Sequence, residues 1–200
     1  MRKFYTMFTG IVHKGRVVQL KPLKEGMVLT IETTLSTKNI KNGDSVAIDG
    51  GCLSVVKKNN NQLTFFVSPE TIDKTRINTY QKGDWVNVEF SLKQHDFIGG
   101  HYVLGHVDTT SKIKKIDVKK EVWIIQVDLP KQFSQYVVYK GSIAVNGVSL
   151  TVNKVSKSTF ELCIIPITLK KSNLSTLSKN ALVNLEFDIL AKYTEKILKK

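Results

Sequence analysis

Cysteine is scarce in this sequence of 200 residues, which contains only Cys52 and Cys163. The two lie far apart and form no C-x-x-C pair, the spacing typical of structural zinc sites and redox centres. Two cysteines also cannot supply the several disulfides that stabilise small secreted domains. The sequence therefore predicts no metal site and a reducing, cytoplasmic location.

Long hydrophobic runs are absent as well. No apolar stretch approaches the roughly 18 residues that a membrane-spanning helix requires. The first residues, 1–6, are basic but lack the apolar segment of a secretion signal. We therefore expect no membrane partner and no export.

Arginine and aromatic residues are also few, although the formal net charge is +13. The arginines are Arg2, Arg16 and Arg76, aromatic residues make up 8%, and nearly all the positive charge is lysine in scattered pairs. Nucleic-acid readers depend on the planar guanidinium of arginine and on rings that stack on bases. We interpret the charge as a solvated surface that attracts anionic solutes, and predict no nucleic-acid partner.

What the chain does contain is a repeat of its own sequence. The segment S-V-A-I-D-G-G-C-L-S-V begins at Ser45, and S-I-A-V-N-G-V-S-L-T-V begins at Ser142, 97 residues later. No gap is needed from Ser45 to Phe90, and roughly a third of the positions are identical. The chain is predicted to hold two copies of one unit, residues 7–97 and 98–188.

Each copy contains about six short segments rich in β-branched and aromatic residues, separated by turn signals such as Asp49-Gly50-Gly51. This spacing favours a small closed barrel over a parallel α/β fold. We expect the first strands of the copies at 7–12 and 102–107, one short helix within 70–78, and a short helix or turn at 131–138.

The last twelve residues, 189–200, have helical spacing, with Ile189, Tyr193 and Ile197 four residues apart. A short amphipathic helix at a chain end is marginally stable alone. We therefore expect it to pack against the body of the protein or against another subunit.

Each copy of the repeat contains a predicted strand with two small polar residues two positions apart. Period two places Ser149 and Thr151 on one face and the apolar residues around them on the other, and Cys52 and Ser54 take these places in the first copy. One interpretation is an ordinary solvent-facing side. The other is a pair of small polar groups at a barrel mouth that hydrogen-bond the edge of a flat heterocycle, which the repetition and the thiol favour.

Two histidines five residues apart, His101 and His106, follow the glycine pair Gly99-Gly100. On a strand they would point to opposite faces, and no further ligands are evident, which excludes a zinc site. Two interpretations stay open: one exposed and one structurally bonded histidine, or one imidazole that faces a pocket and transfers a proton near neutral pH. Glycines here allow a ligand to approach the backbone closely.

Taken together, six motifs resemble the riboflavin synthase family. In chain order they are M-F-T-G-I-V at Met7, G-x-C-L-[ST]-V at Gly50, G-G-H-x-x-x-G-H-V at Gly99, Y-K-G at Tyr139, G-V-S-L-T-V at Gly147 and V-N-x-E-x-D at Val183. They span Met7 to Asp188, and their combination is specific although no single motif is.

The resemblance implies an all-β fold of two similar six-stranded antiparallel Greek-key barrels in tandem, with a short C-terminal helix, assembled as a homotrimer. It implies a dismutation of two molecules of 6,7-dimethyl-8-ribityllumazine to riboflavin and 5-amino-6-ribitylaminouracil, without metal or organic cofactor. Each barrel would bind one lumazine, with the reacting pair between the N-terminal barrel of one subunit and the C-terminal barrel of the next. An association with lumazine synthase is also expected.

The resemblance also implies site residues. We assign Cys52, His106, Ser149 and Thr151 to proton transfer or to positioning of a nucleophile, with Ser45, Lys140 and Asp188 in support. The family's ligand contacts correspond to Gly10, Ile11, Val12, Cys52, Leu53, Ser54, Phe66, Val67, Ser68, Pro69, Glu70, Thr71, Gly105, His106, Val107, Lys140, Ser149, Leu150, Thr151, Cys163, Ile164, Ile165, Pro166, Ile167 and Thr168.

The sequence departs from the family at a few positions. Residues 1–6 precede the usual first methionine, here Met7, so either Met7 is the start or the extension must lie clear of the site. Ser54 replaces the commoner threonine, Gly51 stands where a cysteine or valine is common, and Ile167 replaces a polar residue.

Two rival functions remain. A lumazine-binding antenna protein would have the same barrels without catalysis, but such relatives depart from the G-G-H-x-x-x-G-H and S-L-T-V patterns that this chain keeps. A nucleic-acid-binding barrel would interleave aromatic and basic residues on one sheet face, and no such stripe is present.

Overall fold

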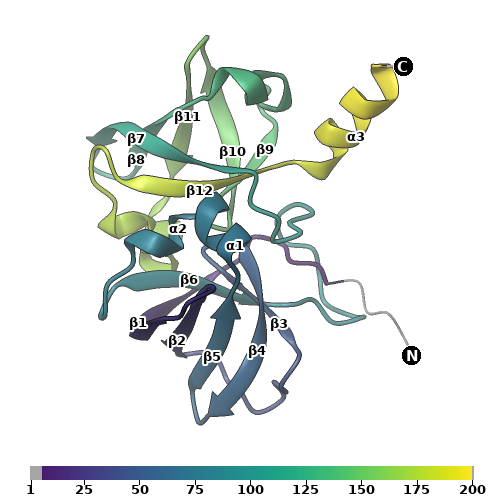
Figure 1. Cartoon of the computed structure of the whole chain (residues 1–200). Coiled ribbons are helices and arrows are strands. Elements are labelled where there is room, and N and C mark those ends of the chain that lie inside the picture. The colour runs from purple at the N-terminus through teal and green to yellow at the C-terminus, as the bar shows by residue number, and fades with distance from the viewer. Residues whose placement is uncertain (1–5, 200) are drawn as a thin grey trace.

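A computed structural model describes residues 6–199 of the chain, so the expected extension 1–6 lies outside the described residues except for Thr6. Figure 1 shows two barrels, one above the other, each built from one copy of the repeat. The predicted all-β tandem architecture is confirmed.

The two barrels have the same strand order. In the first, β1 (His13–Pro22), β2 (Met27–Thr33), β3 (Ser45–Ile48), β4 (Gly51–Asn59), β5 (Gln62–Val67) and β6 (Trp85–Phe90) close in the order β1-β2-β5-β4-β3-β6. In the second, β7 (Thr109–Val118), β8 (Trp123–Asp128), β9 (Ser142–Val145), β10 (Val148–Val155), β11 (Thr159–Ile164) and β12 (Leu182–Phe187) repeat that order, β7-β8-β11-β10-β9-β12. Neighbouring strands are antiparallel in both.

Two-residue turns join β3 to β4 and β9 to β10. Asp49 and Gly50 have φ of 44° and 80°, and Asn146 and Gly147 have φ of 46° and 74°. Positive φ at both central residues defines the type I′ turn that Asp-Gly and Asn-Gly favour in hairpins. Gly50 and Gly147 also face each other across the contact between the barrels, since a Cβ on Gly147 would lie 2.6 Å from the Gly50 nitrogen.

Alternation along the strands fills each barrel with apolar side chains. On β10, Val148, Leu150 and Val152 are buried in the second barrel, whereas Ser149 and Thr151 lie on its outer face. β4 has the same pattern, with Leu53 and Val55 inside the first barrel. The predicted period-two arrangement is confirmed. Because the interior is filled, the polar pair faces the outside of the barrel wall rather than the barrel mouth that we expected.

Short helices follow β5 and β11. The expected helix within 70–78 is two pieces, α1 (Pro69–Lys74) and the 3₁₀ helix η1 (Arg76–Thr79), because the extended Thr75 interrupts them. The second copy repeats this with α2 (Pro166–Lys171) and η3 (Asn173–Thr176). The expected helix or turn at 131–138 is the 3₁₀ helix η2 (Lys131–Tyr136).

The expected first strands, 7–12 and 102–107, were wrong. They are extended segments that pair with each other at one bridge, Phe8 with Val103, with N–H···O distances of 2.8 and 3.1 Å. The side chains of Phe8 and Val103 pack between the barrels instead of in a barrel wall, which explains the strand-like apolar pattern. We call 7–12 and 102–107 the crossing segments.

Each crossing segment joins both barrels. The Gly10 carbonyl accepts a hydrogen bond from the Ser149 N–H of the second barrel (3.0 Å), and the Gly105 carbonyl accepts one from the Cys52 N–H of the first barrel (2.9 Å). The two segments are therefore exchanged between the barrels in a symmetric way.

A buried glutamate from the last strand of each barrel holds its own crossing segment. Glu89 accepts hydrogen bonds from Thr9 and Gly10, and Glu186 accepts from the N–H groups of Leu104 (2.7 Å) and Gly105 (3.0 Å). Burial raises the pKa of both carboxyls, that of Glu186 to about 7, although the backbone donors oppose the shift.

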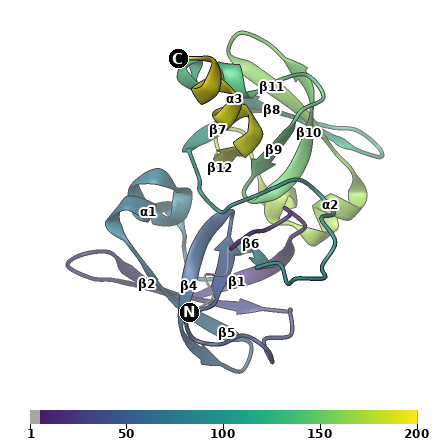
Figure 2. The same ribbon diagram turned by 90° about the vertical axis from the view of Figure 1, so that its right-hand side faces the viewer.

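The C-terminal helix α3 (Ile189–Leu198) confirms the predicted helix. Asp188 caps its first turn, Lys192 pairs with Asp108 at 2.6 Å, and Glu195 bonds Tyr136 of η2. Figure 1 shows α3 extending away from the second barrel, and in Figure 2 the helix lies in front of that barrel. The side chains of Leu190, Tyr193, Ile197 and Leu198 are 62–77% exposed. Within residues 6–199, no helix has the length and apolar character to cross a membrane.

Gly147→Ala is expected to lower the free energy of unfolding by about 3 kcal/mol. The alanine would have to adopt a left-handed backbone conformation, and its methyl group would overlap Gly50 of the other barrel. Gly43→Ala is the matched control, since Gly43 has φ of 92° but its added Cβ would meet nothing within 4 Å. We expect Gly43→Ala to lose only the backbone part, about 1 kcal/mol. Urea unfolding measures both, and equal losses would show that the contact between the barrels tolerates a methyl group.

Glu186→Gln is expected to remove a pH dependence of stability. The folded pKa of Glu186 is about 7 against 4.5 for an unperturbed carboxyl, so the folded protein holds a proton that the unfolded chain releases between these values. The resulting stability is complete below pH 4.5 and is lost as the pH rises through 7.

The unfolding free energy of the wild type should therefore fall by up to about 3 kcal/mol relative to that of Glu186→Gln across this window. Urea titrations at several pH values measure the difference. The exposed Glu121→Gln should follow the wild-type profile, and a parallel profile for Glu186→Gln would contradict the assignment.

Candidate functional site

Two pockets lie where a crossing segment of one repeat packs on the outer face of the other barrel. The first pocket, about 270 Å³, is lined by Gly51, Cys52, Glu70, Thr71, Lys74, Thr75, Gly105, His106 and Val107. The second pocket, about 180 Å³, is lined by Gly10, Ile11, Val12, Val148, Ser149, Ile167, Thr168, Lys171 and Ser172. The repeat relates them, because Cys52 corresponds to Ser149, Thr71 to Thr168 and Lys74 to Lys171.

Most of the lining was expected from the sequence. The first pocket brings together the predicted residues Cys52, Glu70, Thr71, Gly105, His106 and Val107. The second brings together Gly10, Ile11, Val12, Ser149, Ile167 and Thr168. Helices α1 and α2 form one wall of each pocket, and the crossing segments form another.

Cys52 is half-buried at the first pocket, and its thiol is free. Burial raises the pKa of the Cys52 thiol, a hydrogen bond with Ser45 opposes the shift, and the Glu186 carboxylate adds to it. The thiol is therefore protonated near neutral pH. It can donate a hydrogen bond or a proton, but it is a weak nucleophile.

Ser149 is paired with His101 at the second pocket. The His101 Nδ1 lies 2.7 Å from the Ser149 Oγ. Burial lowers the pKa of His101, and the negative charge of Asp188 opposes the shift. The imidazole is therefore neutral near pH 7, the form that can accept a proton from a hydroxyl group.

Gly100 allows this pair to form. A Cβ there would lie 2.1 Å from the Thr9 carbonyl and 2.8 Å from the Ser149 Oγ. Gly100 thus allows the chain before His101 to pack closely on Ser149, whereas a Cβ on Gly99 would meet the Ile11 side chain. His106, by contrast, is exposed at the edge of the first pocket.

Sequence reasoning missed two lysines that line the pockets and the histidine that contacts Ser149. The sequence left open whether either histidine of the pair faces a pocket, and a role was assigned only to His106, five residues after His101. Lys74 and Lys171 were not singled out, although the repeat relates them and each lies at the end of a pocket helix. Aligning the lysines across the repeat could have found them.

The other predicted residues lie outside these two linings in the described part of the chain. Leu53, Val67, Leu150 and Ile164 are buried in the barrel cores. Ser45 lines a separate cavity of about 420 Å³, and Asp188 caps α3. Those with half-buried or exposed side chains elsewhere are Ser54, Phe66, Ser68, Pro69, Lys140, Thr151, Cys163, Ile165 and Pro166. Their roles stay predictions.

The described residues form no cluster of typical metal ligands. Among residues 6–199, no group of three or more His, Cys, Asp or Glu side chains could hold a metal ion. The chemistry that the two pockets offer is hydrogen bonding and proton transfer by thiol, hydroxyl, imidazole and ammonium groups.

Comparisons with known proteins agree with this arrangement. A family model of the lumazine binding domain matches residues 9–91 and 104–188, one copy for each barrel. The riboflavin synthase of Bacillus amyloliquefaciens is 36% identical over 195 residues, covering 97% of this chain and 91% of that protein. The riboflavin synthase of Buchnera aphidicola subsp. Schizaphis graminum is 38% identical over 203 residues, covering 97% of each chain.

A solved structure shares the fold. The crystal structure of LumP complexed with 6,7-dimethyl-8-(1'-D-ribityl) lumazine has a TM-score of 0.81 at 20% identity and covers 90% of this chain and 99% of that chain. Two matched domains and extensive identity over nearly the whole length lead to one conclusion. The chain belongs to the riboflavin synthase family, and each of its two barrels matches the lumazine binding domain.

Proposed function

We propose that this protein is a riboflavin synthase that converts two molecules of 6,7-dimethyl-8-ribityllumazine into riboflavin and 5-amino-6-ribitylaminouracil. The observation that carries the proposal is the presence of two pockets, related by the repeat, on a chain 36–38% identical to riboflavin synthases. A reaction between two copies of one substrate needs two similar binding sites, and two tandem barrels provide them.

The chemistry divides between the two rings. The 7-methyl group of a lumazine is acidic because its carbanion delocalises into the ring. One bound ring must lose that proton, and the other must become electrophilic by adding a nucleophile at C7. Holding the rings face to face lowers the barrier through orientation.

The second pocket suits the proton abstraction. The Ser149 hydroxyl can take the methyl proton while its own proton passes to the neutral His101 Nδ1, 2.7 Å away. The low pKa of His101 keeps this acceptor unprotonated near pH 7. The first pocket offers instead the protonated Cys52 thiol and the Lys74 ammonium group, which can hydrogen-bond the acceptor ring.

Assembly and location follow as parts of the same proposal. Four large apolar side chains of α3 are 62–77% exposed, and a group of exposed apolar side chains supports packing against other subunits in a homotrimer. Both cysteines are free thiols, which supports a reducing, cytoplasmic location.

Purified protein mixed with 6,7-dimethyl-8-ribityllumazine tests the activity. We expect riboflavin and 5-amino-6-ribitylaminouracil in equal amounts, followed by flavin absorbance and by chromatography. Binding of the lumazine with altered fluorescence but without turnover would instead identify a non-catalytic antenna protein.

His101→Gln is expected to lower kcat by about 10²–10⁴-fold with little change in KM, because it removes a general base. The wild-type rate should fall at acid pH as His101 becomes protonated, and this acid limb should be absent in the variant. Steady-state assays between pH 5 and 8 measure both effects. His95→Gln is the control, since His95 is exposed in the connection between the barrels, and an unchanged pH profile in His101→Gln would refute the role.

A further inference from the structure

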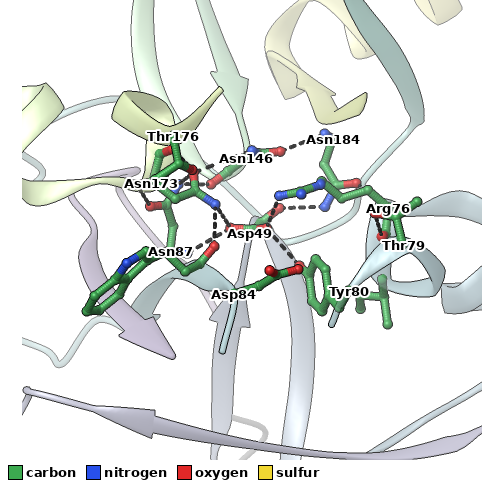
Figure 3. A network of polar contacts seen from close by, with 12 residues as sticks. Asp49, Arg76, Thr79, Tyr80, Asp84, Asn87, Asn146, Asn173, Thr176 and Asn184 are labelled. Carbon is green, nitrogen blue, oxygen red and sulfur yellow. Dashed lines mark hydrogen bonds and ion pairs between the residues drawn. The ribbon is translucent and has the colours of Figure 1, made fainter. Parts of the chain in front are cut away.

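One buried carboxylate lies at the contact between the two barrels. The side chain of Asp49 is fully buried, and Figure 3 shows the polar groups that surround it. Its Oδ1 accepts hydrogen bonds from the Asn87 N–H (2.7 Å) and the Asn173 Nδ2 (2.9 Å). Its Oδ2 accepts from the Arg76 guanidinium (2.9 Å) and the Tyr80 hydroxyl (2.8 Å). Four donors therefore satisfy both oxygens of this carboxylate.

The backbone around Asp49 follows the two-fold pattern of the repeat. The Asn184 Nδ2 donates to the Asp49 carbonyl at 2.8 Å, and its counterpart Asn87 donates to the Asn146 carbonyl at 2.8 Å. The Arg76 N–H likewise donates to the Asn184 Oδ1, as the Asn173 N–H does to the Asn87 Oδ1. These amides bind each barrel to the other.

The side chains break that symmetry. Asp49 corresponds to Asn146 in the second copy, Arg76 to Asn173, and Tyr80 to Leu177. The charged groups of the network thus come from the first copy alone, while the second copy supplies neutral amides. Asn173 of the second copy nevertheless donates to Asp49 of the first.

The network touches the walls of both pockets. Arg76 directly follows Lys74 and Thr75, which line the first pocket. Asn173 directly follows Lys171 and Ser172, which line the second pocket. The Asp49 carboxylate accepts one side-chain hydrogen bond from each of these two segments.

The Asp49 carboxylate is fully paired in a low-dielectric interior, which favours a rigid arrangement, and removal of its charge leaves the charge of Arg76 unpaired. The Arg76 side chain is only 16% exposed, and within residues 6–199 its Nε finds no hydrogen-bond partner. Its guanidinium therefore depends on Asp49. Loss of the carboxylate would remove one side-chain hydrogen bond from the Arg76 segment and one from the Asn173 segment. Both segments would then be held less tightly, by their remaining backbone bonds to Asn184 and Asn87.

We propose that Asp49 is a positioning residue that holds the walls of both pockets in register across the contact between the barrels. The inference rests on the proposed function in taking both pockets as ligand sites. Asp49 acts through Arg76 on the first pocket and through Asn173 on the second, and it touches no substrate itself.

Thiol reactivity tests the positioning role without a ligand. In a Cys163→Ser background, Cys52 reports on the first pocket. A second protein with Cys52→Ser, Ser149→Cys and Cys163→Ser reports on the second pocket at the corresponding position. Asp49→Asn, which copies the residue at position 146, should raise the rate of reaction with a disulfide reagent at least tenfold at both thiols, because both walls open more often.

Leu63→Ala is the matched control. Leu63 is fully buried in the first barrel and is not among the residues that line the pockets. It should lower Tm as Asp49→Asn does but leave both thiol rates within about threefold of the wild type. Equal rate increases in Leu63→Ala and Asp49→Asn at matched Tm loss, or an increase at only one thiol, would overturn the proposal.

The double variant Asp49→Asn with Arg76→Asn tests whether removal of both charges restores the low thiol reaction rates. It recreates in the first copy the neutral Asn146–Asn173 arrangement of the second and removes the unpaired guanidinium. Both thiol rates should return to within about threefold of the wild type. A double variant as reactive as Asp49→Asn alone would show that the ion pair does not hold the walls.

Titration with 6,7-dimethyl-8-ribityllumazine separates this inference from the proposed function. Asp49→Asn should raise the Kd of both sites at least tenfold, and Leu63→Ala should not. If the wild type bound no lumazine while the thiol rates still rose in Asp49→Asn, the positioning role would stand and the proposed function would fall.

Discussion

The exchange of crossing segments between the barrels is the interaction on which the rest of the structure depends. Each barrel donates one backbone hydrogen bond to the other copy's segment, from Ser149 to Gly10 and from Cys52 to Gly105. These bonds place the residue after each glycine over the outer face of the opposite barrel. Neither pocket is complete within one copy, because each copy supplies the barrel and helix residues of one lining but only the crossing-segment residues of the other.

Duplication gives two similar pockets, and side-chain differences give them different chemistry. Cys52 is a protonated thiol because burial disfavours its charged form, whereas Ser149 has a neutral imidazole as a hydrogen-bond partner. The same division appears in the network between the barrels, where Asp49 and Arg76 face neutral amides of the second copy. A reaction in which two identical substrates play opposite roles requires such an asymmetry in an otherwise symmetric frame.

Much of the fold followed from local pattern. The 97-residue repeat predicted two equal units, and period two on β4 and β10 predicted which side chains face the core, because strand alternation needs no tertiary information. The crossing segments were misassigned as strands because residues such as Phe8 and Val103 are as apolar as those of a strand. Their burial between the barrels is a long-range contact that periodicity does not encode.

The repeat and the strand pattern predicted two barrels, and the motifs indicated the family. The ligand contacts implied by that resemblance include most residues that line the two pockets, and their roles stay predictions. Tertiary structure alone decided that His101 pairs with Ser149, that the polar faces lie outside the barrels, and that Asp49 joins the two copies. Hydrogen-bond partners 48 or 124 residues apart are brought together by barrel closure and docking, and pKa shifts follow from the burial that results. The order of residues in the sequence shows neither which distant groups meet nor how deeply each group is buried.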